Sequence, residues 1–465
     1  VGEAEERDIE VQTDFLRVVF TNRGARVKHW ELKGYHDTQG AHVDLVPQGV
    51  RDAGLPFSLV TGEAAVDAQI NNALFTLVDQ SSTARGSGPR KLVFEYRNSA
   101  LVVVRKAFTV NPGGFTIGFV ADVSVGGTPA NLAVAMGAGL GDVETSSGTS
   151  YSQKASGLVH RGGKVERFAA KDIVAQPAYE GTYDFAGADD HYFISTALLG
   201  NKPASITYRH RAVAKTPTKA EYDFVSYTLN PGGENIDLTF YIGPKEFGTL
   251  KAVDQNLVRA IDFGMFGWLA VPLLSALKGL NAYLNNFGWS IIALTVLLNL
   301  AIFPLRQKSF VSMRKLQALQ PEIKAIQDRY GKLKTTDPDK QKMNAELMGL
   351  YKERGVNPAS GCVPILLTMP LLFAFYSLLS AAIELRGAPF MLWITDLSVY
   401  DPYYVTPILM GGTMVLQQMM TPSQADPVQQ KIFGYMPILF TFMLASLPAG
   451  LVIYWAWNNF LSIIQ

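Results

Sequence analysis

The chain has 465 residues, of which 48% are hydrophobic and only 17% are charged. Soluble globular proteins carry about a quarter charged residues, so this composition favours membrane-spanning segments over one large soluble core. The net charge of +1 excludes a strongly basic nucleic-acid-binding protein. The single cysteine, Cys362, excludes a disulfide framework and a cysteine-rich metal site.

Residues 1–250 have the sequence of an all-β domain. Aromatic and β-branched residues alternate with polar ones in short runs, which turn signals such as Asn-Pro-Gly-Gly at 111–114 separate. Roughly a dozen such strands with no helical crossover between them predict a large β-sandwich rather than a parallel α/β sheet. The clearest predicted strands are 14–20, 25–32, 91–96, 100–110, 115–125, 220–229 and 235–243.

Residues 287–465 are of a different kind. The segment 287–305 has 19 residues without a charge, long enough as a helix for the hydrocarbon core of a bilayer. Three more stretches are nearly free of charge, and the last, 432–465, is too long for one span and contains the turn sequence Leu-Pro-Ala-Gly. We therefore expect five membrane-spanning helices, at about 287–305, 362–383, 403–420, 432–447 and 449–465.

The distribution of charge predicts how these spans are oriented. Residues 306–354 carry 12 Lys and Arg against 6 Asp and Glu, so we expect this loop in the cytoplasm. The loop from Glu384 to Pro402 has one basic residue and is expected outside. The β-domain then lies outside and the C-terminus inside. Because such a domain must be translocated, we expect a signal or anchoring segment before Val1.

Two amphipathic segments complete the predicted plan. Within 251–286, an apolar face over 257–284 fits a helix in the outer membrane interface, and the alternative is a connecting helix packed on the β-domain. Within 306–354, apolar residues at a and d positions predict an antiparallel helical hairpin with a kink at Pro321.

The spans offer little for catalysis. No histidine, aspartate or glutamate lies inside an expected span, which argues against a membrane protease and against a proton-coupled or ion-coupled transporter. Cys362 has no histidine near it in the sequence and reads as a small buried residue. No phosphate loop, zinc-ligand spacing or nucleotide fingerprint occurs. We therefore predict no catalytic residue, no metal and no cofactor.

Uncharged polar side chains do occur inside the expected spans. Thr295 and Asn299 share one helical face, Gln418 lies deep in another span, and Tyr454 and Trp455 lie in the last. Such groups either hydrogen-bond one helix to another or line a concavity that water reaches. The residue types alone leave both readings open.

Four stretches of the chain carry distinctive motifs. They are FGWSIIALTVLLNLAIFPL (287–305), NPASGCVPILLTMPLLFAFY (357–376), DPVQQKIFGYMPILFTFML (426–444) and PAGLVIYW (448–455). These motifs resemble those of the YidC family of bacterial membrane protein insertases. The resemblance is dense over 250–465 and looser over the β-domain. It implies a periplasmic all-β supersandwich followed by a five-helix transmembrane core with a cytoplasmic hairpin, in the bacterial inner membrane.

The resemblance also implies a mechanism. A hydrophilic groove, open to the cytoplasm and the lipid, takes the polar tail of a nascent membrane protein while the apolar segment enters the lipid. The implied partners are nascent membrane proteins, membrane lipids, the Sec translocon and the ribosome, with no cofactor and no bound nucleic acid. The implied groove residues are Thr295, Asn299, Gln418, Tyr454 and Trp455.

One position departs from the family pattern. Most members have an arginine shortly before the Phe-Pro-Leu that ends the first span, where this chain has Asn299. Arg306 lies two helical turns further on, about 10 Å along the axis and on nearly the same face. Its guanidinium is able to point back toward Asn299 and Thr295, so we include Arg306 among the groove candidates. The alternative is an arginine that extends to the lipid headgroups.

Two other functions remain as alternatives to insertion. A small-solute transporter or channel with an outer β-domain is one, although the five spans show no internal repeat of the kind many transporters have. A carbohydrate-binding or carbohydrate-modifying β-domain is the other. Its mark would be paired carboxylates, and Asp189-Asp190-His191 is the only tight acidic cluster.

Overall fold

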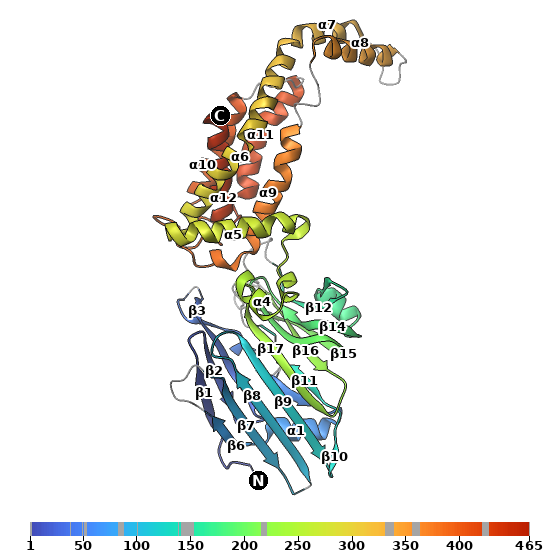
Figure 1. The fold of residues 1–465 in the computed structure, drawn as a ribbon, viewed down its shortest axis with the longest axis vertical. Coiled ribbons are helices and arrows are strands. Elements are labelled where there is room, and N and C mark those ends of the chain that lie inside the picture. Colours follow the sequence, from blue (N-terminus) through green and yellow to red (C-terminus); the bar gives the residue numbers. More distant parts are fainter. Residues whose placement is uncertain are drawn as a thin grey trace. The chain divides into compact units, whose positions relative to one another are not determined.

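The computed structural model describes residues 2–37, 39–48, 50, 54–81, 88–99, 101–137, 139–140, 153–214, 221–330, 339–355, 363–420 and 427–464. Cys362 falls outside these ranges. The chain forms two compact units, Val1–Ile261 and Asp262–Gln465, and each is described by itself (Figure 1).

The first unit is built from two β-sheets. The smaller has four strands in the order β1 (Asp8–Gln12), β2 (Leu16–Thr21), β3 (Arg26–His36) and β4 (His42–Asp44). The larger has 13 strands, which are β5 (Pro56–Val60), β6 (Thr76–Ser81), β7 (Arg90–Arg97), β8 (Val102–Val110), β9 (Thr116–Val125), β10 (Thr128–Pro129), β11 (Ala133–Met136), β12 (Ser156–Arg161), β13 (Lys164–Phe168), β14 (Ala178–Asp189), β15 (Phe193–Ala214), β16 (Glu221–Asn230) and β17 (Asn235–Pro244).

Every strand pairing among the described residues is antiparallel, which confirms the prediction against a parallel α/β sheet. The seven strands predicted most clearly correspond to β2, β3, β7, β8, β9, β16 and β17. The short helices α1 (Ala64–Asn72), α3 (Ala170–Ala175) and α4 (Phe247–Val253) were not predicted. They are too short to show a sustained helical period.

The core of this unit lies between the two sheets. Trp30 of β3 is fully buried and donates from Nε1 to the carbonyl of Ile242 on β17, 3.0 Å away, so it joins one sheet to the other. Lys106 of β8 is also buried, and its ammonium donates to the carbonyls of Gly24 at 2.6 Å and Phe57 at 2.8 Å. A buried cation is tolerated here because several backbone oxygens replace its water.

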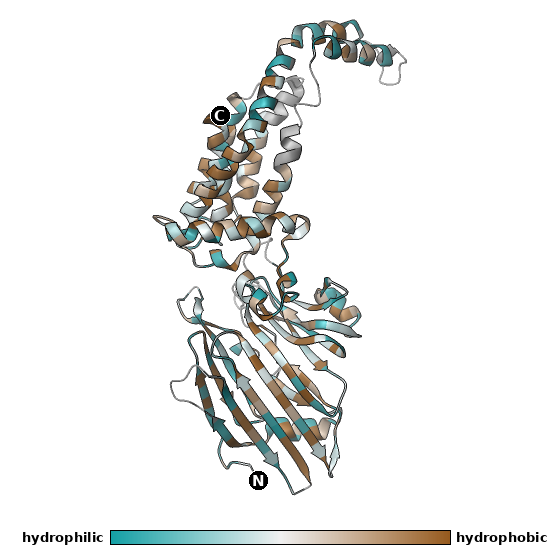
Figure 2. Ribbon diagram, in the orientation of Figure 1, coloured by the Kyte–Doolittle hydropathy of each residue, from teal (hydrophilic) through white to brown (hydrophobic). Residues whose placement is uncertain are grey.

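The second unit is helical. It contains α5 (Gly267–Leu284), α6 (Phe287–Ala318), α7 (Gln320–Tyr330), α8 (Asp339–Glu353), α9 (Val363–Ala381), α10 (Val405–Met420), α11 (Pro427–Leu444) and α12 (Ala449–Ile464). Helix α6 packs against α5 and α12, and α10 packs against α11 and α12. Hydrophobic residues run along these helices (Figure 2). Many of them are exposed, including Leu300, Ile438 and Phe442, as expected of surfaces that face lipid.

Two described helical segments are long and apolar enough to cross a membrane, Gly264–Leu284 and Phe287–Lys308. The apolar segments Met369–Ala381, Gly434–Leu444 and Ala449–Ile464 are shorter. Helices α6, α9, α10, α11 and α12 occupy the five segments expected to be spans, and the crossing of a bilayer by each stays a prediction.

The structure corrects two predicted helix boundaries. Helix α6 does not end at residue 305 but continues through Pro304 to Ala318, so the predicted hairpin begins later than residue 306. Pro321 lies in the first turn of α7, where its missing N–H costs nothing, and the break falls at Leu319 rather than at a kink within a helix. The helix predicted over 257–284 begins only at Gly267, because Gly264 has a positive φ of 63° that an α-helix cannot contain.

Helices α7 and α8 pack antiparallel to each other. Arg354 at the end of α8 bonds to Glu322 at the start of α7 at 2.9 Å, and Arg329 at the end of α7 lies 3.7 Å from Glu346. Ile323 of α7 and Tyr351 of α8 both pack on the buried side chain of Leu319. This pairing agrees with the predicted hairpin, whose cytoplasmic location stays a prediction.

Candidate functional site

Helices α6 and α12 face each other with polar side chains inside the helical unit. Asn299 Nδ2 donates to Asn458 Oδ1 at 3.2 Å, and Arg306 Nη1 donates to Ser462 Oγ at 3.1 Å. Ser462 Oγ in turn donates to the carbonyl of Asn458 at 2.8 Å. Two amides, a hydroxyl and a guanidinium thus form one connected network across the helix interface.

Arg306 turns back along its own helix. Its Nη1 donates to Asn299 Oδ1 at 2.7 Å, seven residues earlier, which is the orientation of one of the two alternatives that the sequence left open. Thr295 takes part through its backbone: its carbonyl accepts from Asn299 Nδ2 at 2.8 Å, while its hydroxyl donates to the carbonyl of Ile291 at 2.7 Å. Thr295 is thus linked to Arg306 through the side chain of Asn299.

A cavity of about 190 Å³ lies beside this network, between α6, α9 and α12. It has room for several water molecules. Beside it, the ring of Tyr454 stacks on Phe375, with 4.2 Å between centroids. Its lining consists of Leu298, Asn299, Ile302, Arg306, Met369, Leu371, Leu372, Tyr454 and Asn458.

The cavity brings together only part of the residue set expected from the sequence. Asn299, Arg306 and Tyr454 line it. Thr295 is fully buried one turn away, and Gln418 on α10 and Trp455 on α12 are half-buried and do not belong to the lining. These three were expected from the family resemblance, which carries positions but not the packing of this chain.

Sequence reasoning did not select Asn458 and Ser462. Both lie on one face of α12 with Tyr454, at intervals of four residues. That spacing is a signal in the sequence, and it separates Asn458 from its neighbour Asn459, which faces α10 and donates to Thr413 Oγ1 at 3.4 Å.

A larger apolar crevice runs between α10 and α11. Its volume is about 680 Å³. Close to its base the helices meet at Gly411, where an added Cβ would lie 2.1 Å from Thr441 Oγ1. Its lining comes from two helical stripes: Tyr404, Pro407, Ile408, Gly411 and Val415, and Pro437, Ile438, Thr441, Phe442, Ala445 and Ser446.

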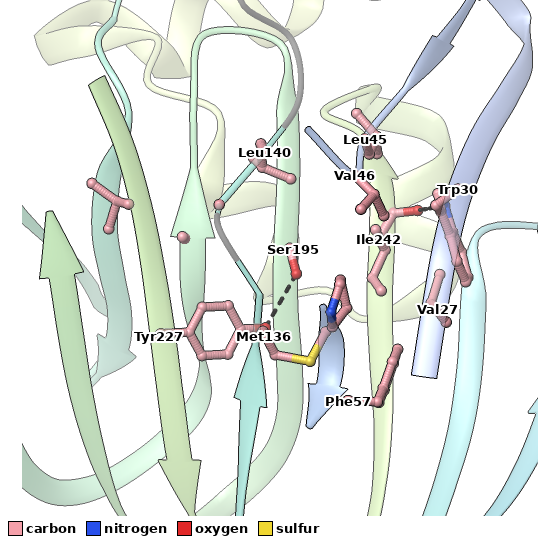
Figure 3. A pocket seen from close by; sticks show the side chains of 14 residues that line it. Val27, Trp30, Leu45, Val46, Phe57, Met136, Leu140, Ser195, Tyr227 and Ile242 are labelled. Carbon is pink, nitrogen blue, oxygen red and sulfur yellow. Dashed lines mark hydrogen bonds between the residues drawn. The ribbon is translucent and has the colours of Figure 1, made fainter. Parts of the chain in front are cut away.

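The β-rich unit contains a small enclosed cavity of about 20 Å³ between its sheets (Figure 3). Trp30, Phe57 and Met136 are among the side chains around it, and Ser195 Oγ lies 3.2 Å from the hydroxyl of Tyr227. This volume holds about one water molecule and no sugar ring. The cavity gives the carbohydrate hypothesis no support.

The Asp189-Asp190-His191 cluster is structural in its first two members. Asp189 is fully buried, and its Oδ2 bonds to Lys245 at 3.0 Å and to Arg167 at 3.2 Å. Burial alone would raise the pKa of Asp189, but these two cations outweigh it and lower that pKa. Asp190 Oδ1 accepts from the backbone N–H groups of Tyr192 and Phe193. The two carboxylates are therefore used by the fold.

One group of side chains has the composition of a cation site. Ligand atoms of His29, Glu31 and Asp44 lie within 4.8 Å of one another. Contacts within the protein account for this group, because His29 Nδ1 lies 2.7 Å from Asp44 Oδ2 and Glu31 pairs with Arg17 at 2.7 Å. We assign no ion to it.

Comparison with known proteins gives the family. The family model of the YidC periplasmic domain matches residues 8–276, and that of the 60Kd inner membrane protein matches residues 279–465. The Membrane protein insertase YidC of Geobacter metallireducens is 37% identical over an alignment that covers 99% of this chain and 85% of that relative. The chain belongs to the YidC family. The YidC of Syntrophus aciditrophicus is 35% identical, with 100% and 85% of the two chains covered.

A crystal structure of an active YidC insertase is similar over 99% of this chain and 92% of that one, at 19% identity and a TM-score of 0.41. The family match confirms the resemblance stated from the motifs. As a member of the YidC family, the chain combines a β-rich domain of the periplasmic type with the helical region of an inner-membrane insertase.

Proposed function

We propose that this chain inserts nascent membrane proteins by giving their hydrophilic tails a polar surface within the bilayer. The observation that carries the proposal is the network of Arg306, Asn299, Asn458 and Ser462 beside the cavity between α6, α9 and α12. A cation and two amides are costly to place within a lipid bilayer, and such groups therefore indicate a functional site.

The physical problem of insertion is the passage of polar backbone and side chains through hydrocarbon. Each polar group without a hydrogen-bond partner there costs several kcal/mol. The Asn299 and Asn458 amides and the Arg306 guanidinium offer replacement partners, and Arg306 attracts acidic residues of a tail. The apolar segment of the client supplies the driving force, about 25 cal/mol for each Å² of apolar surface that it buries in lipid. This scheme needs no catalytic residue, nucleotide or cofactor.

The proposal includes an orientation. Helices α6, α9, α10, α11 and α12 span the inner membrane, with the β-rich unit in the periplasm and the C-terminus in the cytoplasm. The basic charge between α6 and α9 supports this through the positive-inside rule. The exposed apolar residues Trp268 and Tyr283 of α5 suit the outer interface. Helices α7 and α8 then stand in the cytoplasm, where we propose that they help to recruit the client or the ribosome. The Sec translocon is the partner that we propose beside the chain in the membrane.

Photo-crosslinking of stalled nascent chains tests the proposal. A photoreactive residue at position 458, in the cavity lining, is expected to capture the hydrophilic tail of a single-span client. The same residue at position 442, which is 86% exposed on α11, is expected to capture the apolar segment or lipid but not the tail. If position 458 captures no tail from a client that is inserted efficiently, the cavity is not the path and the proposal is wrong.

The alternative of a small-solute transporter or channel is tested with the purified protein in liposomes. Purified protein in sealed liposomes would then conduct or accumulate a solute without any client, and nascent chains would not contact position 458. No second observation in the described residues favours this function.

A further inference from the structure

Two arginines bind the β12–β13 hairpin to the segment that leads out of the β-rich unit. Arg167 on β13 donates from Nη2 to the carbonyl of Ala260 at 2.5 Å. In the opposite direction, Arg259 donates from Nη1 to the carbonyl of Gly163 in the turn of the hairpin. The hairpin and the short 3₁₀ helix η2 (Leu257–Ala260) thus hold each other by reciprocal charge-assisted hydrogen bonds.

Asp189 orients Arg167. Its buried carboxylate accepts from Arg167 and Lys245 on Oδ2, and from Ser156 at 2.9 Å and Gln153 at 3.0 Å on Oδ1. Side chains from β12, from β13 and from the residue after β17 therefore converge on the carboxylate of Asp189 at the end of β14. A buried network of this kind is rigid, because breaking any member leaves another charge without a partner.

The segment that Arg167 holds is also packed by its apolar side chains. Leu257 and Ala260 are fully buried, and Ile261 is 8% exposed. Beyond Ile261 only residues 262–266 precede the start of α5 at Gly267, and Gly264 among them has a positive φ of 63°. The contacts of the β-rich unit therefore continue to the last residues before the helical unit.

We propose that the β12–β13 hairpin is a clamp that fixes residues 257–261 on the β-rich unit. Arg167 closes the clamp, and Asp189 is the positioning residue that holds Arg167 in place. The clamp confines free movement of the connector to the two residues between Ile261 and the 3₁₀ helix η3 (Gly264–Phe266), because Phe266 of η3 stacks on Phe373 of α9. This proposal also gives a structural role to Asp189 of the Asp189-Asp190-His191 cluster.

Hydrogen exchange of the full chain in detergent micelles tests the clamp. The reporters are the amides of Arg259 and Ile261, which donate to the carbonyls of Asn256 and Val258. Arg167→Met keeps the apolar stem and removes the bond to Ala260. It is expected to speed exchange at both amides by roughly ten- to hundredfold, the loss of one charge-assisted hydrogen bond, and to leave exchange on β8 and β9 unchanged.

The matched control is Arg161→Met in the same hairpin, because Arg161 forms only an exposed ion pair with Glu166. This variant is expected to change neither reporter. Asp189→Asn should reproduce the effect of Arg167→Met, and if that variant does not fold, Arg167→Met alone decides. Unchanged exchange at Arg259 and Ile261 in Arg167→Met overturns the proposal. An equal rise throughout β8 and β9 also overturns it, since Arg167 would then support the whole unit rather than this segment.

Discussion

Arg306 donates a 2.7 Å hydrogen bond to Asn299, seven residues earlier on α6. The guanidinium therefore lies beside Asn299, where the resemblance to the family implies an arginine, although the α-carbon of Arg306 is about 10 Å away along the helix. Side chains on a helix lean toward its N-terminus, and this tilt makes the reach of Arg306 sufficient. A positive charge near position 299 can therefore come from an arginine seven residues later in the sequence.

This relationship predicts a rescue. Arg306→Ala should lower the insertion of clients with acidic translocated tails by about tenfold, because one charge-assisted interaction is worth roughly 1.5–3 kcal/mol. Adding Asn299→Arg should restore insertion, because it places a guanidinium close to the position that the Arg306 guanidinium occupies beside Asn299. Lys308→Ala is the matched control, because Lys308 is exposed on the same helix. Insertion is measured by protease protection of the tail in vesicles, and full activity of Arg306→Ala would show that no fixed cation is needed.

The contact between α10 and α11 predicts different outcomes at two adjacent glycines. Gly411→Ala places a Cβ 2.1 Å from Thr441 Oγ1, so either the Thr441 side chain or the two helices must shift, at a cost of about 1–3 kcal/mol. Gly412→Ala meets no atom within 4 Å and should be neutral. Thermal unfolding in detergent measures both. Adding Thr441→Ala should recover part of the loss in Gly411→Ala. Equal stability of the two single variants would contradict the packing described.

Removing α7 and α8 should impair insertion without unfolding the remaining helices. A deletion of 319–354 with a short glycine-serine linker keeps α6 whole, whereas a cut at 313 would interrupt it. The deletion removes every basic residue between α6 and α9 but none of the cavity lining. Insertion of several clients is compared with the amount of folded protein in detergent. Unchanged insertion would mean that the hairpin is only a spacer.

Removal of the β-rich unit should depend on where the cut is made. A deletion of 8–245 removes every strand of both sheets and should reduce insertion only modestly, because no described side chain of the cavity comes from this unit. A deletion of 20–200 leaves β17 without β9 and should yield less protein, since unpaired strand edges aggregate. Immunoblots give the yield, and client insertion is measured per molecule. Complete loss of insertion at normal yield in the longer deletion would assign the unit a direct role.

The burial of Lys106 predicts that the free energy of unfolding changes with pH between neutral and alkaline values. Burial lowers the pKa of Lys106 well below its ordinary value, and the nearby Arg26 lowers it further. The unfolded chain then binds more protons than the folded one between the lowered pKa and the unfolded value of about 10.4, so stability rises with pH across that window. Lys106→Met should flatten this rise and cost about 1–3 kcal/mol at neutral pH, because backbone carbonyls lose their donor. Urea unfolding from pH 7 to 10 measures both effects, and an unchanged slope would contradict the assignment.

Local pattern was enough to predict much of the fold. The alternation of residues 100–110 is typical of a strand, and the uninterrupted apolar stretch 287–305 is long enough for a membrane helix, so local pattern alone predicts β8 and the start of α6. Family motifs then indicated the insertase core. Helix ends were predicted less well. No local signal ends α6 after its apolar part at residue 305, and the helix continues to Ala318.

The sequence by itself determined the β-strands of the first unit, the apolar helices of the second, and the polar positions within those helices. It also determined that Arg306 is able to reach Asn299. All of these depend on the geometry of one strand or one helix. Only the tertiary structure decided which polar residues meet. Asn458 and Ser462 join the network because α12 packs on α6, while Thr295, Gln418 and Trp455 lie outside the cavity lining. The same holds for Asp189, whose partners Arg167 and Lys245 come from distant strands. Contacts between elements depend on how side chains fill shared space, and no single segment contains that information.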